Sequence, residues 1–135
     1  MPDGVDIAET DGRAARDITG SPDKKEYGMD APFTYVVKFW VDPKGADTIM
    51  HWLDSKHTAE VVAQPGFRWV RRVRFDENAT DGWYAYMMIY GLESRDALMR
   101  YFESDAPKRY AQERKPFEHQ LRTERGWGEI DFKIG

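Results

Sequence analysis

Hydrophobic and polar positions divide the chain from Phe33 onward into alternating strand and helix segments. Residues 33–41 are almost all aromatic or β-branched and end at the turn sequence Asp-Pro-Lys-Gly, which predicts a first strand. Residues 46–63 repeat apolar side chains at three- and four-residue steps, which predicts a helix. Gln64-Pro65-Gly66 ends this helix and opens a second strand over residues 67–75.

The second half of the chain repeats this pattern. Residues 76–82 form a polar hairpin loop that closes with Asp-Gly, and residues 83–92 give a third strand antiparallel to the second. Ser94 is the expected N-cap of a helix, Pro107 either divides that helix or starts a new one, and Pro116 ends the second segment. The apolar run 127–134 predicts a fourth strand. The order β-α-β-β-α-β predicts an α+β, ferredoxin-like sandwich with both helices on one face of an antiparallel sheet.

The sheet face without helices needs a cover, because either orientation leaves aromatic side chains on it. That face carries either Lys38 and Trp40 or Tyr84, Tyr86, Met88 and Tyr90. A second subunit is the expected cover, which makes the protein a homodimer. The first thirty residues lack core-forming periodicity, so we expect residues 1–30 to be a flexible tail or an arm on a partner subunit, and residues 31–135 to be the domain.

Composition narrows the function classes. A net charge of −4, with Arg scattered among Asp and Glu, lacks the basic footprint of a nucleic-acid binder. The absence of Cys excludes thiolate zinc sites, iron–sulfur clusters and a cysteine nucleophile. His51 and His57 are too far apart in sequence to converge on a metal from one helix, and no glycine-rich phosphate loop is present. No apolar run approaches the ~20 residues of a membrane span, so a cytoplasmic protein is expected.

Two side chains stand out as candidate chemistry. His57 shares the apolar face of the predicted helix, where a neutral imidazole can act as a general acid or base, and Glu60 is placed to orient it. The alternative is a structural His57 bonded to a backbone carbonyl. Arg71 falls among the apolar residues of the second strand, so it needs an internal carboxylate or an anionic ligand. Trp69, on the same strand face, offers an indole for stacking.

Three segments resemble the dimeric α+β barrels, which include antibiotic-biosynthesis monooxygenases, EthD-like and NIPSNAP-like proteins and muconolactone isomerases. These are the helix end WLDSKHTAE at 52–60, the junction QPGF at 64–67, and the stretch LMRYFESDAP at 98–107. Asp-Ala-Pro at 105–107, with Phe117 and Arg122 downstream, is closer still to an uncharacterised branch. The resemblance implies a homodimer whose two sheets form a barrel, with a ligand pocket in each subunit between sheet and helices.

The resemblance also bears on cofactors. Members of the superfamily include cofactor-free oxygenases, isomerases, cyclases, lyases and haem-degrading enzymes. The haem-degrading branch places a histidine a few residues after its Ser-Asp pair. Residues 106–112 of this chain contain no histidine, so haem is not expected.

The first hypothesis is therefore a small cofactor-independent enzyme of lyase, isomerase or cyclase type, acting on an apolar or aromatic molecule with an acidic or carbonyl group. His57 would move a proton and Arg71 would hold the anionic end or a developing oxyanion. The expected substrate-binding residues are Trp52, Trp69, Tyr86, Tyr101 and His119. The alternatives are a cofactor-free monooxygenase and a non-catalytic dimer that binds a small ligand. A cavity that touches both His57 and Arg71 would favour the enzyme.

Overall fold

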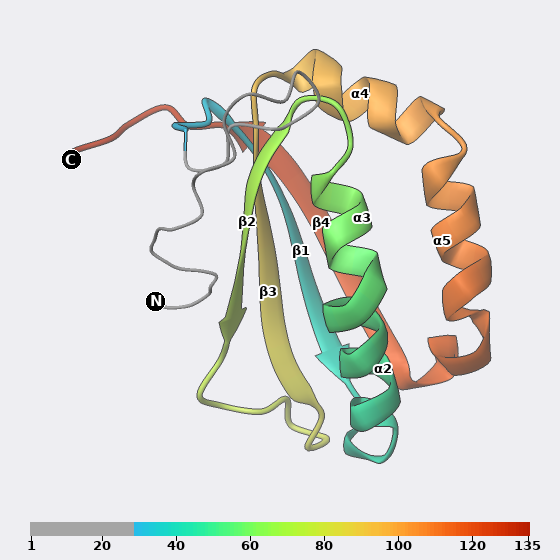
Figure 1. The fold of residues 1–135 in the computed structure, drawn as a ribbon. Coiled ribbons are helices and arrows are strands. Elements are labelled where there is room, and N and C mark those ends of the chain that lie inside the picture. Colours follow the sequence, from blue (N-terminus) through green and yellow to red (C-terminus); the bar gives the residue numbers. More distant parts are fainter. Residues whose placement is uncertain (1–28) are drawn as a thin grey trace.

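The predicted sandwich is the observed fold (Figure 1). The computed structural model describes residues 29–135. Four strands form one antiparallel sheet in the order β2-β3-β1-β4, and the strands are β1 (Phe33–Val41), β2 (Phe67–Arg74), β3 (Tyr84–Leu92) and β4 (Leu121–Glu129). This is the ferredoxin-like order, because β1 and β3 are central and the two edges are β2 and β4.

Both helical layers cover the same face of the sheet (Figure 1). The first runs without a break through α2 (Ala46–Trp52), η3 (Leu53–His57) and α3 (Thr58–Val62), close to the range that the periodicity predicts. The second consists of α4 (Arg95–Glu103) and α5 (Ala106–Arg114), followed by the 3-10 turn η4 (Lys115–Gln120). Ser94 caps α4 by accepting a hydrogen bond from the backbone N–H of Ala97. Pro107 lies in the first turn of α5, so of the two outcomes that the sequence allowed it starts a new helix.

The hydrophobic core lies between this face and the helices. Alternate residues of β1 face this core: Phe33, Tyr35, Phe39 and Val41 are buried there, and Val37 packs against them. The side chains at the even-numbered positions turn to the opposite face. Met88, Tyr90 and Leu92 of β3 are buried on the same side. The orientation that sequence left open is thereby fixed: Lys38 and Trp40 belong to the face without helices.

The fourth strand begins six residues earlier than predicted. The sequence placed it on the apolar run 127–134, but β4 runs from Leu121 to Glu129 and pairs with the full length of β1. Ile130, Phe132 and Ile134 instead lie in a tail after the sheet, where Phe132 is 77% and Ile134 is 88% exposed. The apolar pattern does not predict this pairing, because β4 presents the polar residues Thr123 and Arg125 to a cavity between the sheet and the helices.

The first helical layer contains one π-helical turn, Leu53–His57, in which the backbone N–H of Thr58 donates to the carbonyl of Leu53. Such single turns insert an extra residue and occur frequently at functional sites. Here the turn ends on His57. No helix among the described residues is long and apolar enough to cross a membrane. The expected tail, residues 1–30, lies outside the described residues except for its last two.

Candidate functional site

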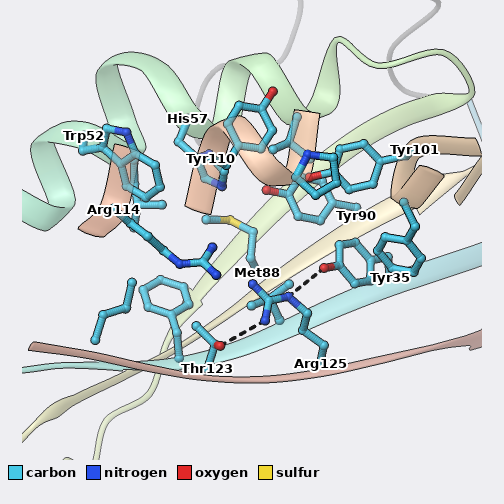
Figure 2. A pocket seen from close by; sticks show the side chains of 17 residues that line it. Tyr35, Trp52, His57, Met88, Tyr90, Tyr101, Tyr110, Arg114, Thr123 and Arg125 are labelled. Atoms are coloured by element: carbon cyan, nitrogen blue, oxygen red, sulfur yellow. Dashed lines mark hydrogen bonds between the residues drawn. The ribbon is translucent and has the colours of Figure 1, made fainter. Parts of the chain in front are cut away.

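A cavity of about 290 Å³ lies between the sheet and the helices. Figure 2 shows the side chains that surround it, which come from both the sheet and the helices. The sheet contributes residues of β1, β3 and β4, and the helices contribute residues of α2, η3, α3, α4 and α5. Most of the lining is aromatic or aliphatic: Tyr35, Val37, Phe39, Trp52, Leu53, Val61, Met88, Tyr90, Tyr101, Phe102, Pro107, Tyr110 and Leu121.

His57 lines this cavity from the end of the π-turn. Its imidazole stacks on Trp52, with ring centroids 4.2 Å apart and planes 15° apart, and meets Tyr110 edge-on at 4.5 Å. Its Nδ1 atom is buried and has no hydrogen-bond partner among residues 29–135. Since buried polar atoms are nearly always paired, this nitrogen has hydrogen-bonding capacity that the described residues leave unused.

The environment keeps His57 neutral. Burial is the main cause, and it lowers the pKa of His57 from 6.5 to about 4, with the positive charge of Arg114 acting in the same direction. Glu113 opposes the shift. The imidazole is therefore unprotonated at physiological pH and can accept a proton.

Glu113 holds the aromatic partner of His57 in place. Its Oε1 accepts a hydrogen bond from the indole Nε1 of Trp52 at 3.1 Å, and its Oε2 pairs with Lys56 at 2.9 Å. One carboxylate of α5 thereby joins the second helical layer to the first, at the residue before the π-turn and at a residue within it. The ring against which His57 stacks is fixed by this contact.

Two arginines supply the charge in the cavity. Arg114, at the end of α5, is half-buried, and Arg125, on β4, is the exposed lining residue. Burial and the nearby Arg125 both lower the pKa of Arg114. Arg125 is held by two hydrogen bonds, from Nε to the hydroxyl of Tyr35 at 3.0 Å and from a terminal nitrogen to Oγ1 of Thr123 at 3.1 Å. Figure 2 shows both guanidinium groups pointing into the cavity.

Three of the residues expected from the sequence meet at this cavity: His57, Trp52 and Tyr101 all line it. Burial raises the pKa of Tyr101 and also that of Tyr90, so both phenols stay protonated. The cavity thus combines a neutral imidazole with phenols and guanidinium groups, in an aromatic setting.

Arg71 and Trp69 lie elsewhere, and the expectation that Arg71 faces the interior is wrong. A bulge between Phe67 and Trp69 shifts the register of β2 on β3, so that Trp69 and Arg71 share the sheet face without helices. Arg71 is exposed and stacks its guanidinium over Trp69, with 5.0 Å from Cζ to the ring centroid. Because the guanidinium group is exposed and stacks on this indole, Arg71 does not require an internal carboxylate or an anionic ligand.

The other three expected residues also lie outside the cavity lining. Glu60 makes no hydrogen bond with His57, and its Oε1 is buried without a partner among the described residues. Tyr86 stacks on Phe39 at 5.0 Å, behind the cavity wall. His119 lies exposed in η4. In the described part of the chain, no group of three His, Asp or Glu side chains is arranged to hold a metal ion.

Few features of the sequence indicate that Arg114 and Arg125 belong to the site. Arg114 reads as a basic residue in the last turn of a helix, a common stabilising position. Arg125 follows Leu121 and Thr123 at two-residue spacing, and with Trp127 this alternation is a weak strand signal in a segment rich in charge. Only the pairing of β4 with β1 reveals that this side of the strand faces the cavity.

Comparison with known proteins places this geometry in a family. The profile of a domain of unknown function, DUF4286, matches residues 33–126, which include every residue of the cavity. No protein of curated function matches the sequence.

Solved structures with the same fold share little sequence with this chain. HapK from Hahella chejuensis is 19% identical, with a TM-score of 0.56, over 76% of this chain and 97% of its own. An EthD-family protein from Bacillus halodurans C-125 is 16% identical, with a TM-score of 0.53, over 73% and 99%. The N63A mutant of SnoaB from Streptomyces nogalater, a cofactor-independent oxygenase, is 18% identical, with a TM-score of 0.52, over 77% and 98%. These likenesses confirm the predicted fold.

Proposed function

The chain belongs to the DUF4286 family, and from its site we propose that it is a small enzyme in which His57 transfers a proton to or from an aromatic molecule bound in the cavity. The observation that carries this proposal is the neutral imidazole of His57, which lines a cavity of about 290 Å³ and whose buried Nδ1 has no partner among residues 29–135. A cavity of this size suits a mono- or bicyclic molecule.

His57 acts as a base in this proposal. A neutral imidazole accepts a proton from an acidic C–H or a phenolic O–H of the substrate, and returns it at another atom in a lyase, isomerase or cyclase reaction. The stacked Trp52 and the edge of Tyr110 fix the plane of the imidazole, which keeps the accepting nitrogen aimed at one position. Tyr101 and Trp52 provide walls for the aromatic ring of the substrate.

The cavity criterion set from the sequence is met in part. The cavity touches His57 but not Arg71, so the anion-binding role expected for Arg71 does not form part of this proposal. Glu60 is likewise not assigned a role in orienting the imidazole, because Trp52 and Tyr110 are its contacts.

Cofactor-independent oxygenation is the second candidate. It is favoured by the fold that the chain shares with SnoaB, which is described as a cofactor-independent oxygenase. The first step would be the same, since removal of a proton from an electron-rich phenol by His57 yields an anion that can react with oxygen. The two candidates differ in oxygen consumption, which an oxygen electrode measures.

The test is a turnover screen with enolisable and phenolic aromatic compounds, followed by His57→Gln. The variant keeps the size and polarity of the side chain but is a far weaker base, so we expect turnover to fall at least about a hundredfold while the fold is retained. His51→Gln is the matched control, because His51 is exposed on α2 and does not line the cavity. Full activity in folded His57→Gln protein would overturn the proposal and favour a non-catalytic ligand-binding dimer.

We also propose that the protein is a homodimer that pairs through the sheet face without helices. This face carries Val36, Trp40, Met87, Ile89 and Val73, and Val73 is 41% exposed in the single subunit. A solved structure with this fold, from an uncultured marine organism, is described as a dimeric ferredoxin-like protein. Light scattering should return twice the mass of one chain.

A pair of variants tests this interface. Ile89→Glu places a charge at the centre of the face and should give monomers, because an unpaired buried carboxylate is costly. Phe132→Glu makes the same type of change in the exposed tail after β4 and should leave the dimer intact. A wild-type chain that is monomeric at micromolar concentration would remove this proposal.

A further inference from the structure

The charge around the cavity is one-sided. Its seventeen lining residues include Arg114 and Arg125 but no Asp or Glu. Among residues 29–135, no carboxylate lies within 4 Å of either guanidinium group, although five other Lys or Arg side chains form such pairs. Two positive charges that share an apolar cavity repel each other, and Arg125 lowers the pKa of Arg114. The charge of Glu118 opposes this effect from outside the cavity lining, so an anion bound between the two guanidinium groups would stabilise both.

The guanidinium group of Arg125 is held in one orientation, with N–H donors left over for a ligand. Its bonds to Tyr35 and Thr123 fix the plane of the guanidinium and use two of the five N–H donors that such a group carries. Figure 2 shows this guanidinium group pointing into the cavity. A planar, fixed fork of this kind binds a carboxylate through two parallel hydrogen bonds.

Arg114 faces the same space from the helical layer. It ends α5, where the helix dipole favours a positive charge, and it makes no hydrogen bond or ion pair within the described part of the chain. The guanidinium groups of Arg125, on the sheet, and Arg114, on the helical layer, therefore lie on two sides of one end of the cavity. The aromatic residues and His57 line the rest of the cavity.

We propose that the substrate is an aromatic carboxylic acid, whose carboxylate lies between Arg114 and Arg125 while its ring lies among the aromatic residues beside His57. This inference rests on the proposed function and assigns the anionic end of the substrate to one place in the same cavity. The carboxylate enters from the rim at Arg125, which is the exposed side of the cavity. A neutral analogue of the same shape would leave both guanidinium groups without an anion.

Binding of the carboxylic acid would also change the pKa of His57. The charges of Arg114 and Arg125 both lower the pKa of His57, after the larger effect of burial. A bound carboxylate compensates these charges, so the pKa of His57 rises in the complex. The imidazole becomes a stronger base when the correct substrate is present, and it stays a weak one in the free protein.

The experiment measures binding of matched pairs by calorimetry: benzoic, salicylic and 2-naphthoic acids against their primary amides. The full-length protein should bind the acid of at least one pair at least about tenfold more tightly than the amide, and added salt should weaken only the acid. Arg125→Gln and Arg114→Gln should each remove this preference. Arg100→Gln, which changes an exposed arginine on α4, is the control and should keep it.

A second measurement follows the imidazole of His57 by NMR titration. Saturation with the acid should raise its pKa, and Arg125→Gln should raise it in the ligand-free protein. The inference is overturned if no acid binds more tightly than its amide, or if the preference survives in both arginine variants. If amides bind as tightly as acids and are turned over in a reaction that needs His57, this inference alone is refuted. If binding of the acids needs both arginines but their turnover is the same in His57→Gln and wild-type protein, the proposed function alone is refuted.

Discussion

Protonation of His57 should cost the protein stability as the pH falls, and the size of this effect follows from the burial of the imidazole. The perturbation is His57→Gln, which removes the titrating group while leaving a polar side chain of similar size. In the folded protein burial lowers the pKa of His57 to about 4, whereas an unfolded chain has the ordinary value of 6.5. The unfolded state therefore takes up a proton first as the pH falls.

The sign and magnitude follow from linkage. Between pH 6.5 and about 4 the unfolded state binds more protons at this position than the folded state, so the free energy of unfolding decreases as the pH falls through that window. Above pH 6.5 both states are neutral and the contribution is constant. At about 1.4 kcal/mol for each pKa unit, the full gap corresponds to about 3 kcal/mol.

The assay is urea denaturation at pH 7.5, 6, 5 and 4, followed by tryptophan fluorescence. Carboxylates titrate in the same range, so the informative quantity is the difference between the wild-type protein and His57→Gln at each pH. The wild type should lose about 3 kcal/mol more than the variant between pH 7.5 and 4. His51→Gln should follow the wild type, because His51 is exposed. Parallel curves for wild type and His57→Gln would refute the argument that burial keeps this imidazole neutral.

Three further predictions concern the rest of the molecule. Gly91→Ala should destabilise the fold by roughly 1–3 kcal/mol in urea melts, because its Cβ would lie 2.3 Å from the ring of Trp69, whereas Gly128→Ala, with no atom within 4 Å, should change little. Arg71→Gln should leave the binding of aromatic acids unchanged in calorimetry, since Arg71 faces away from the cavity, and a loss of binding would reinstate it as a ligand residue. Removal of residues 1–28 should leave the melting temperature unchanged, as expected for a segment without core periodicity, and a large drop would show that it docks on the domain.

The parts of the fold that could be predicted are those with a regular apolar pattern. Helical periodicity between Ala46 and Ala63 placed His57 on the inner face, and the structure confirms that position with the same neighbours, Leu53 and Val61. The β-α-β-β-α-β order followed from turn residues and capping signals, which act over a few residues and can be read locally.

Arg71 shows what local reading misses. Its neighbours Trp69 and Val73 are apolar, and this correctly grouped the three on one strand face. The bulge after Phe67 and the position of the helices decide whether these residues face the interior or the opposite side of the sheet. Neither feature can be read from the alternation of apolar and polar residues along β2. Apolar residues on β2 therefore mark the surface that we assign to the dimer, whereas the sequence argument took them for the interior.

The missed strand and the missed arginines have one physical cause. On the inner face of β4, Thr123 and Arg125 take positions that a packed core would fill with apolar side chains, because they border a cavity. A sequence pattern detects a buried strand by its apolar side, so a strand that serves a site looks like a polar loop, and the apolar tail beyond it looks like the strand. The failure itself points to the site: β4 pairs along its length with β1, yet its inner face carries Arg125, the residue that we propose to bind the anion.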